Sequence, residues 1–242
     1  SFGDSSWQWD AAVNYGKMRQ KSVNYGFLDY AGFQQGLGPS YRDASTGQVT
    51  CGTPGNPIAG CTPINIFNVN DPTTIAALKN IQRNPATTTE YTVKQFEANA
   101  NGNLFELPAG MVNLATGFSY RKESTSTRTD PLAVADLNGL CGVVEFCSSV
   151  LAGSFNVKEA YAETLIPLLS GKPWAQTLNL TLGTRWSDYS SAGRSTNSKL
   201  AVEWRPIENL LLRGTVSEVF RAPNISELYG GIAGDAPTVN DP

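Results

Sequence analysis

Hydrophobic and polar residues alternate along several stretches of the chain, which is the pattern of a β-strand with two unlike faces. The clearest stretches cover residues 176–189, 199–205 and 210–217, where Leu, Val and Trp alternate with Asn, Thr, Lys and Arg. Strands are also expected over residues 7–15, 91–106, 109–123 and 154–168. The sequence therefore predicts an all-β chain with an antiparallel sheet of about seven strands.

The connections between these strands fall into two classes. Turns near residues 107–110, 170–173 and 206–209 are short, whereas residues 17–88 and 124–153 form long connections without sustained alternation. In outer-membrane barrels short turns face the periplasm and long loops face outward. The asymmetry is typical of such a barrel.

The first long connection carries features of its own. A short helix is expected with Asp71 as its N-cap and Pro72 at its first helical position. Aromatic residues are frequent in this loop, and they could stack on sugar rings or aromatic ligands, or form the loop's own small core. They are Tyr25, Phe27, Tyr30, Phe33, Tyr41 and Phe67.

Strand length bears on whether the sheet crosses a membrane. Runs of roughly 10–14 residues match a tilted bilayer crossing and exceed the usual five or six residues of globular strands. A soluble β-sandwich with one solvated face would show the same alternation. The pattern thus leaves a transmembrane barrel segment and a secreted sandwich as alternatives.

Composition narrows the possible functions. The chain has 242 residues, a net charge of −3 and no histidine. The chain has no run of basic residues of the kind that would predict nucleic-acid binding. Without histidine it also lacks the commonest general base and most metal-ligand sets. No stretch approaches the roughly 18 consecutive apolar residues of a transmembrane helix. We therefore expect a protein that is not an enzyme and that holds neither a cofactor nor a metal.

Four cysteines form two close pairs, Cys51 with Cys61 and Cys141 with Cys147. Each pair lies in a stretch rich in turn-forming residues, which favours local disulfides in an oxidising compartment. A metal site is the alternative, but these spacings without histidine fit the usual zinc patterns poorly. Either interpretation places the loops outside a bacterial cytoplasm.

The last strand runs into a distinctive segment, residues 219–230. Because Pro223 lacks the N–H group of a central strand, we expect the ladder to stop at about Phe220. Asn224 can start a tight turn, and Arg221 and Glu227 flank that turn closely enough to form an ion pair. The candidate site residues of this motif are Phe220, Arg221, Ala222, Pro223, Asn224, Glu227 and Leu228.

The segment Phe-Arg-Ala-Pro-Asn-x-x-Glu-Leu resembles one found late in the barrel of TonB-dependent outer-membrane receptors. Residues 103–110, and residues 157–163 running into 166–168, are similar to other stretches of that family. The resemblance covers roughly residues 90–230. It implies that residues 1–242 are an internal piece of a larger barrel, of about 22 strands, whose plug domain and closing strands lie outside this chain.

What the resemblance implies for function is energy-coupled uptake of a bulky nutrient across the outer membrane of a Gram-negative bacterium. The cargo would be a siderophore, haem, cobalamin or an oligosaccharide, and the partners would be the plug domain, the TonB energy-coupling complex and outer-membrane lipid. In the motif, Arg221 and Glu227 would contact cargo or plug inside the lumen, or brace the strand end. The alternatives are a secreted β-sandwich adhesin or carbohydrate-binding module, and a passive porin.

Overall fold

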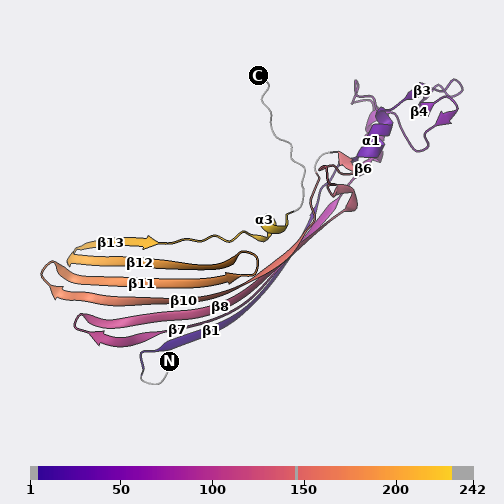
Figure 1. Cartoon of the computed structure of the whole chain (residues 1–242). Helices are drawn as coiled ribbons and strands as arrows, with labels where there is room; N and C mark the ends of the chain where they lie inside the picture. Colours follow the sequence, from indigo (N-terminus) through magenta and orange to yellow (C-terminus); the bar gives the residue numbers. More distant parts are fainter. Residues whose placement is uncertain (1–4, 145–146, 231–242) are drawn as a thin grey trace. The chain divides into compact units, whose positions relative to one another are not determined.

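A computed structural model describes residues 5–144 and 147–230 of the chain. Strands make up 61% of it and helices 11%, and the largest element is an open antiparallel sheet of seven strands (Figure 1). The all-β class and the strand number predicted from the sequence are thereby confirmed. In spatial order the strands are β1 (Gln8–Val23), β7 (Ala86–Leu107), β8 (Gly110–Thr129), β10 (Leu151–Lys172), β11 (Ala175–Tyr189), β12 (Gly193–Ile207) and β13 (Leu210–Ser217).

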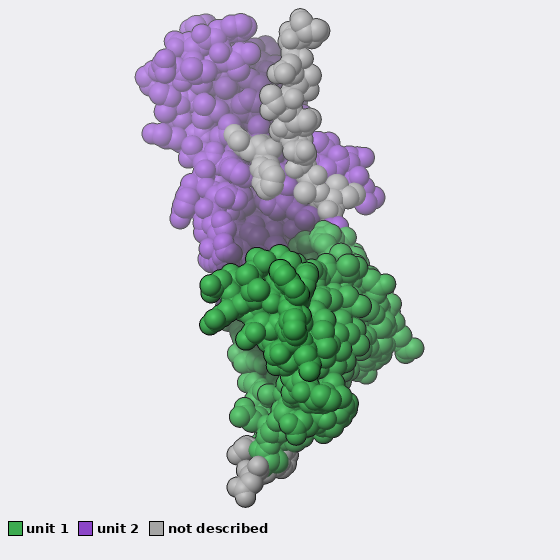
Figure 2. All heavy atoms as spheres, turned by 90° about the vertical axis from the view of Figure 1, so that its left-hand side faces the viewer, with its two compact units in different colours: residues 1–18, 91–125, 153–228 green, residues 19–90, 126–152, 229–242 purple. Residues whose placement is uncertain are grey.

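The chain divides into two compact units, coloured separately in Figure 2. Unit 1 comprises residues 1–18, 91–125 and 153–228, and unit 2 comprises residues 19–90, 126–152 and 229–242. Unit 1 contains β11, β12 and β13 in full, together with most of β1, β7, β8 and β10.

Three tight turns in unit 1 lie where the sequence predicts them. Two residues each separate β7 from β8, β10 from β11, and β12 from β13. In the second of these turns Trp174 adopts a left-handed conformation with φ of 61°. Its carbonyl oxygen accepts a hydrogen bond of 2.8 Å from Nε1 of Trp204, which holds the turn against β12.

The register gives unit 1 two unlike faces. Leu180 pairs with Val202 on one face, and Thr181 pairs with Ala201 on the other. The apolar face is not covered by a second sheet within the described part of the chain, so its large side chains remain open to the surroundings. Among them Leu182, Leu200, Trp204, Leu212 and Val216 are 39–75% exposed. A β-sandwich would bury this face, and the structure therefore disfavours the sandwich alternative.

Unit 2 holds the long connections and several short elements. β2 (Phe27–Asp29) pairs with β6 (Gln82–Arg83) and β9 (Val143–Val144), and β4 (Val49–Thr53) pairs with β3 (Ser40–Arg42) and β5 (Asn56–Pro57). The helical elements are α1 (Tyr30–Leu37), α2 (Pro72–Asn80) and the 3-10 turn η1 (Pro131–Ala133). None of the helices in the described residues is long and apolar enough to cross a membrane.

The predicted helix in the first connection is confirmed. α2 begins at Pro72, and the carboxylate of Asp71 accepts hydrogen bonds from the backbone N–H groups of Thr73 and Thr74 at 3.1 Å. These bonds satisfy two of the free N–H groups at the helix start. The Thr73 hydroxyl, which also donates to this carboxylate, and then the two backbone N–H groups hold the pKa of Asp71 below its ordinary value.

The strands extend further into the long connections than the alternation predicts. β1 continues to Val23 and β8 to Thr129, so the connections are shorter than residues 17–88 and 124–153. The parts of β7 and β8 that lie in unit 2 are polar on both faces, which hides the period of two from the sequence. Their pairing is stabilised instead by threonine hydroxyl contacts across β7 and β8, Thr87 with Thr129 at 3.2 Å and Thr89 with Thr127 at 3.0 Å.

Candidate functional site

The motif segment leaves the sheet earlier than the sequence predicts. β13 ends at Ser217, and the expectation that the ladder continues to about Phe220 is wrong. The physical reason lies at Glu218, whose backbone N–H still donates to the Ser198 carbonyl at 3.0 Å. Its carboxylate then accepts from the Ser198 N–H at 3.0 Å, where the ladder would need a backbone carbonyl. The strand is therefore terminated by a side chain, ahead of Pro223.

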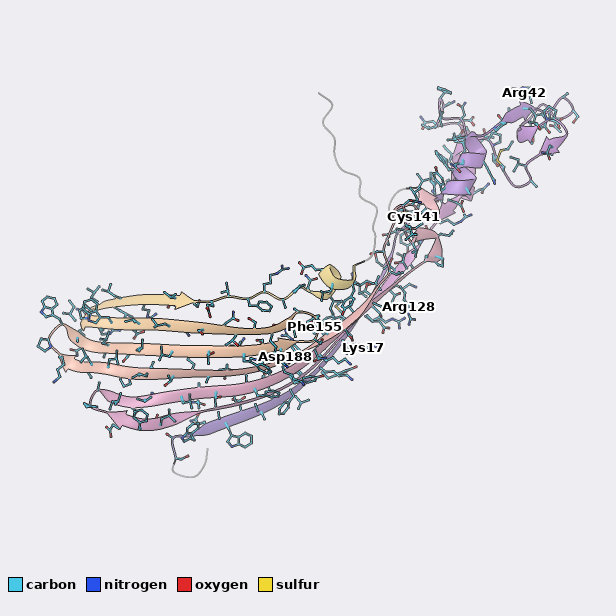
Figure 3. The ribbon with its side chains drawn as sticks, viewed as in Figure 1. Lys17, Arg42, Arg128, Cys141, Phe155 and Asp188 are labelled. Carbon is cyan, nitrogen blue, oxygen red and sulfur yellow. A yellow bond between two sulfur atoms is a disulfide. The ribbon has the colours of Figure 1, made fainter. Side chains whose placement is uncertain are left out.

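Beyond Glu218 the segment packs over the ends of β10 and β11. The Phe220 ring lies 5.9 Å from the Tyr189 ring, which lies 6.3 Å from the ring of Phe155. Phe155, labelled in Figure 3, is 8% exposed, and Ile225 just after the motif proline is 6% exposed. These apolar contacts anchor the motif on the polar face of unit 1.

The motif ends in a short helix, α3 (Ile225–Tyr229), where the sequence predicts a tight turn. Asn224 Oδ1 accepts from the Glu227 N–H at 2.9 Å, and Glu227 Oε2 accepts from the Asn224 N–H at 2.8 Å. This reciprocal pair is a capping box, which favours a helix over a turn. The turn prediction is therefore corrected.

The other carboxylate oxygen of Glu227 receives the guanidinium of Arg221, so the structure brings the predicted pair together. The backbone N–H of Asn224, and then the Arg221 side chain, hold the pKa of Glu227 below its ordinary value. One carboxylate thus links the extended part of the motif to the helix that follows it.

Two hollows flank the motif segment within unit 1. One, of about 430 Å³, lies between the polar face and residues 217–220. The other, of about 410 Å³, lies between residues 222–226 and a wall that contains Tyr91, Arg121, Glu123 and Phe155. In this wall Tyr91 donates to Glu123 at 2.8 Å, and the Arg121 guanidinium lies 2.9 Å from the same carboxylate.

Charged and amide side chains connect the strands across the polar face. Lys199 Nζ lies 2.9 Å from Glu163, and Arg213 lies 3.1 Å from Glu203. Other contacts are Asn99 to Asp10 at 2.9 Å, Tyr161 to Asn99 at 3.1 Å, Ser187 to Glu159 at 2.9 Å, and Arg185 over the Tyr161 ring at 5.8 Å. This face resembles a hydrated lumen wall more than a protein core.

Two of these contacts skip a strand, and a glycine makes each possible. Gly183 on β11 lies between Glu163 and Lys199 in the register, and it leaves room for the ion pair to cross. Gly117 on β8 does the same for Tyr161 and Asn99, because a Cβ there would meet both side chains. Sequence reasoning missed both glycines, and only the cross-strand register could have revealed them.

The six loop aromatics of unit 2 do not form one cluster. Phe27 lies in β2, Tyr30 and Phe33 in α1, and Tyr41 in β3, and no ring–ring contact is found between these aromatics in the described ranges. Tyr25 is 77% exposed and Phe67 is 94% exposed. The fully buried side chains of the unit are instead small, including Thr74, Ala77 and Cys51.

Both cysteine pairs lie at disulfide distance, with Cα–Cα separations of 6.0 Å for Cys51 and Cys61 and 5.6 Å for Cys141 and Cys147. The part of the chain that the structure describes holds no group of three or more His, Cys, Asp or Glu residues arranged for a metal ion. Each cysteine pair forms a disulfide that closes a short loop of unit 2.

A comparison with protein families decides the assignment that this two-faced sheet leaves open. A family model described as TonB dependent receptor-like, β-barrel, matches residues 1–242. The chain belongs to the TonB-dependent receptor β-barrel family. Members of the family are in general transporters in the outer membrane of Gram-negative bacteria, with a plug domain and a TonB partner. No curated protein and no solved structure matches the chain.

Proposed function

We propose that this chain forms part of the wall and outer loops of a receptor that imports a bulky nutrient, a siderophore, haem, cobalamin or an oligosaccharide, by coupling to TonB. Its seven strands would join further strands at β1 and β13 and close around a plug, because open sheet edges are unstable in a bilayer. The long connections of unit 2 would face outward and meet the cargo.

The observation that carries this proposal is the contrast between the two faces of unit 1. Two tryptophans mark the two ends of the apolar face. Trp204 on β12 pairs with Leu178 on β11, and Trp186 lies eight residues further along β11 than Leu178. Eight residues of strand span about 27 Å, or roughly 21 Å across the membrane at a tilt near 40°, which approaches the apolar band of about 25 Å. The opposite face carries ion pairs and hollows that suit a water-filled lumen.

The motif residues would serve this lumen. The capped segment from Arg221 to Glu227 lies over the polar face, where it narrows the space beside β10 and β11. We propose that the Arg221–Glu227 pair braces this segment, and that the hollows beside it are open to cargo or to the plug.

Growth experiments test the function directly. The complete receptor would be the sole route for one candidate nutrient at a time in a strain with or without TonB. The proposal predicts growth on one nutrient class only when TonB is present. Growth that persists without TonB would favour the passive porin, and growth on none of the classes would count against a nutrient receptor.

A further inference from the structure

A row of charged residues crosses the apolar face of unit 1, directly beyond its aromatic residues. On β11 and β12 the register pairs Trp186 with Thr196. Asp188 lies on the same face as Trp186, two residues closer to the end of β11. It pairs with Lys158 on β10 and with Arg194 on β12. The aromatic row and the charged row are thus neighbours, about 7 Å apart along the strands.

The charged row continues on β7 and β8, two positions further from the tight turns than Lys158. A Cβ at Gly117 would contact the side chains of both Asn99 and Tyr161, which shows that these three residues lie side by side on the polar face. Lys122 follows Gly117 by five positions, and Lys94 precedes Asn99 by five. An odd number of steps places both lysines on the apolar face, and the antiparallel pairing places them opposite each other, with Cβ atoms about 5 Å apart.

On β1 the row reaches Lys17, which is labelled in Figure 3. Asp10 bonds to Asn99 on the polar face, and Lys17 lies seven positions further along, hence on the apolar face. In β1, β7 and β8 an aromatic side chain lies on the same face as the lysine. It is two residues from the lysine and closer to the tight turns. The pairs are Tyr15 with Lys17, Phe96 with Lys94, and Tyr120 with Lys122.

Three lysines of this row, Lys94, Lys122 and Lys158, have no acidic partner within salt-bridge distance in the described part of the chain. All three are exposed. Asp188, opposite Lys158, is paired with Arg194 at 3.4 Å. Like charges directly opposite each other destabilise a sheet, so an external anion would relieve the repulsion between Lys94 and Lys122.

We propose that Lys94, Lys122 and Lys158 form a binding site for the phosphorylated headgroup of an outer-leaflet lipid. The proposal rests on the proposed function, in which this face meets lipid. Aromatic rings mark the headgroup level of a bilayer, so ammonium groups one step beyond them lie among the phosphates. Lys94 and Lys122 lie opposite each other, and Lys158 lies on the next strand, two positions nearer the tight turns and so about 8 Å from Lys122. The three lysines span roughly 12 Å and suit a headgroup that carries two phosphates.

Lipid binding to the purified complete receptor tests this site. After delipidation in detergent, native mass spectrometry would count bound lipid A, with two phosphates, phosphatidylglycerol, with one, and phosphatidylcholine, with no net charge. We expect lipid A to bind most tightly. A lysine near an anionic surface contributes about fivefold in affinity, so the triple variant Lys94→Gln/Lys122→Gln/Lys158→Gln should bind lipid A on the order of 100-fold more weakly.

Two control variants distinguish the effect of these three lysines from the effect of the protein's net charge. Replacing all three lysines by arginine should keep lipid A bound. Removing the same charge elsewhere, with Arg42→Gln/Lys79→Gln/Lys172→Gln, should leave binding unchanged. Equal binding of lipid A by the glutamine variant, equal retention of phosphatidylcholine by the unaltered receptor, or complete displacement of lipid A by millimolar inorganic phosphate would overturn the proposal.

The lipid count requires neither cargo nor TonB. A receptor that binds lipid A through these lysines but supports no growth would count against the proposed function alone. A receptor that imports its cargo and yet binds lipid A equally well without the lysines would refute only the lipid site.

Discussion

Replacing Gly117 with alanine should destabilise the sheet through side chains of two other strands. Gly117 lies on β8 between Asn99 on β7 and Tyr161 on β10, and the Tyr161 hydroxyl donates to Asn99 Oδ1 at 3.1 Å across it. A Cβ at position 117 would lie 2.5 Å from Cε1 of the Tyr161 ring and would also overlap the Asn99 side chain. The ring and the amide must therefore move apart, and their hydrogen bond is lost.

The size of the effect follows from these contacts. Loss of a partly buried hydrogen bond costs about 1 kcal/mol, and forcing an extra methyl group into an occupied space costs typically about 1–3 kcal/mol. Alanine recovers roughly 0.5–1 kcal/mol because it has less conformational freedom in the unfolded chain than glycine. The expected net loss of unfolding free energy is roughly 1–3 kcal/mol.

Gly183→Ala is the matched control. Gly183 also lies beneath a contact that skips a strand, but there the nearest atom to a Cβ would be Glu163 Oε2 at 3.4 Å, which is an ordinary contact distance. This variant should be neutral or slightly stabilised. Urea unfolding of the complete receptor in micelles, followed by tryptophan fluorescence, compares the two.

A double variant separates the clash from other effects of alanine. With Tyr161→Ser the ring is gone, and Gly117→Ala should then cost at least about 1 kcal/mol less than it does in the unaltered protein. Equal stability of the two single alanine variants, or full additivity of Gly117→Ala with Tyr161→Ser, would refute this account of the glycine.

Three further predictions concern the motif, the lumen and the loops. The pKa of Glu227 is lower in the folded state than its ordinary 4.5, so its contribution to α3 is present above that value and is lost as the pH falls through the lowered pKa. A spin label at Ser226 should then become mobile in acid, whereas with Glu227→Ala it should be mobile at every pH; a label equally immobile in both proteins contradicts the capping role. Lys199→Gln should lower the free energy of unfolding in urea by less than about 1 kcal/mol, because the Lys199 and Glu163 side chains are 41% and 45% exposed. This loss should shrink with added salt, and a loss that stays the same would argue against an ion pair in water. Reduction of Cys51–Cys61 and Cys141–Cys147 should remove roughly 2–3 kcal/mol each and speed proteolysis of the loops; unchanged cleavage would show that the staples do not stabilise them.

The sheet could be predicted because its signal is local. In unit 1 each strand has one apolar and one polar face, and the tight turns carry proline or glycine, so residue order alone gives strand number and turn position. The same reasoning fails where β7 and β8 enter unit 2. There both faces are polar, and pairing rests on threonine contacts between residues about 40 positions apart.

The two loop helices show the same division between local and distant causes. α2 is marked by Asp71 and Pro72, which are sufficient signals on their own. α1 has Asp29 as its N-cap but contains Gly32 and Gly36, which weaken helix propensity. These glycines are required because side chains of Ile81 and Ile64 occupy the space that a Cβ would fill. Packing partners so distant in the sequence leave no local pattern.

The motif was predictable in part. The spacing of Arg221 and Glu227 indicated their pairing. The sequence Asn224-x-x-Glu227 also matches a capping box, which predicts a helix after the proline. The end of the strand at Ser217 could not be foreseen, because it depends on the Glu218 side chain reaching Ser198 on the neighbouring strand.

The central claim is that one face of this sheet meets lipid and the other meets water. Spin labels would be placed singly at Leu180, Val202 and Leu212, and at Thr181 and Ala201, in the complete receptor in bilayers. The account predicts that oxygen dissolved in lipid reaches the first three labels and that a water-soluble quencher reaches the other two. Shielding of the first three labels from both reagents would place them in a dry core between two sheets and contradict the barrel.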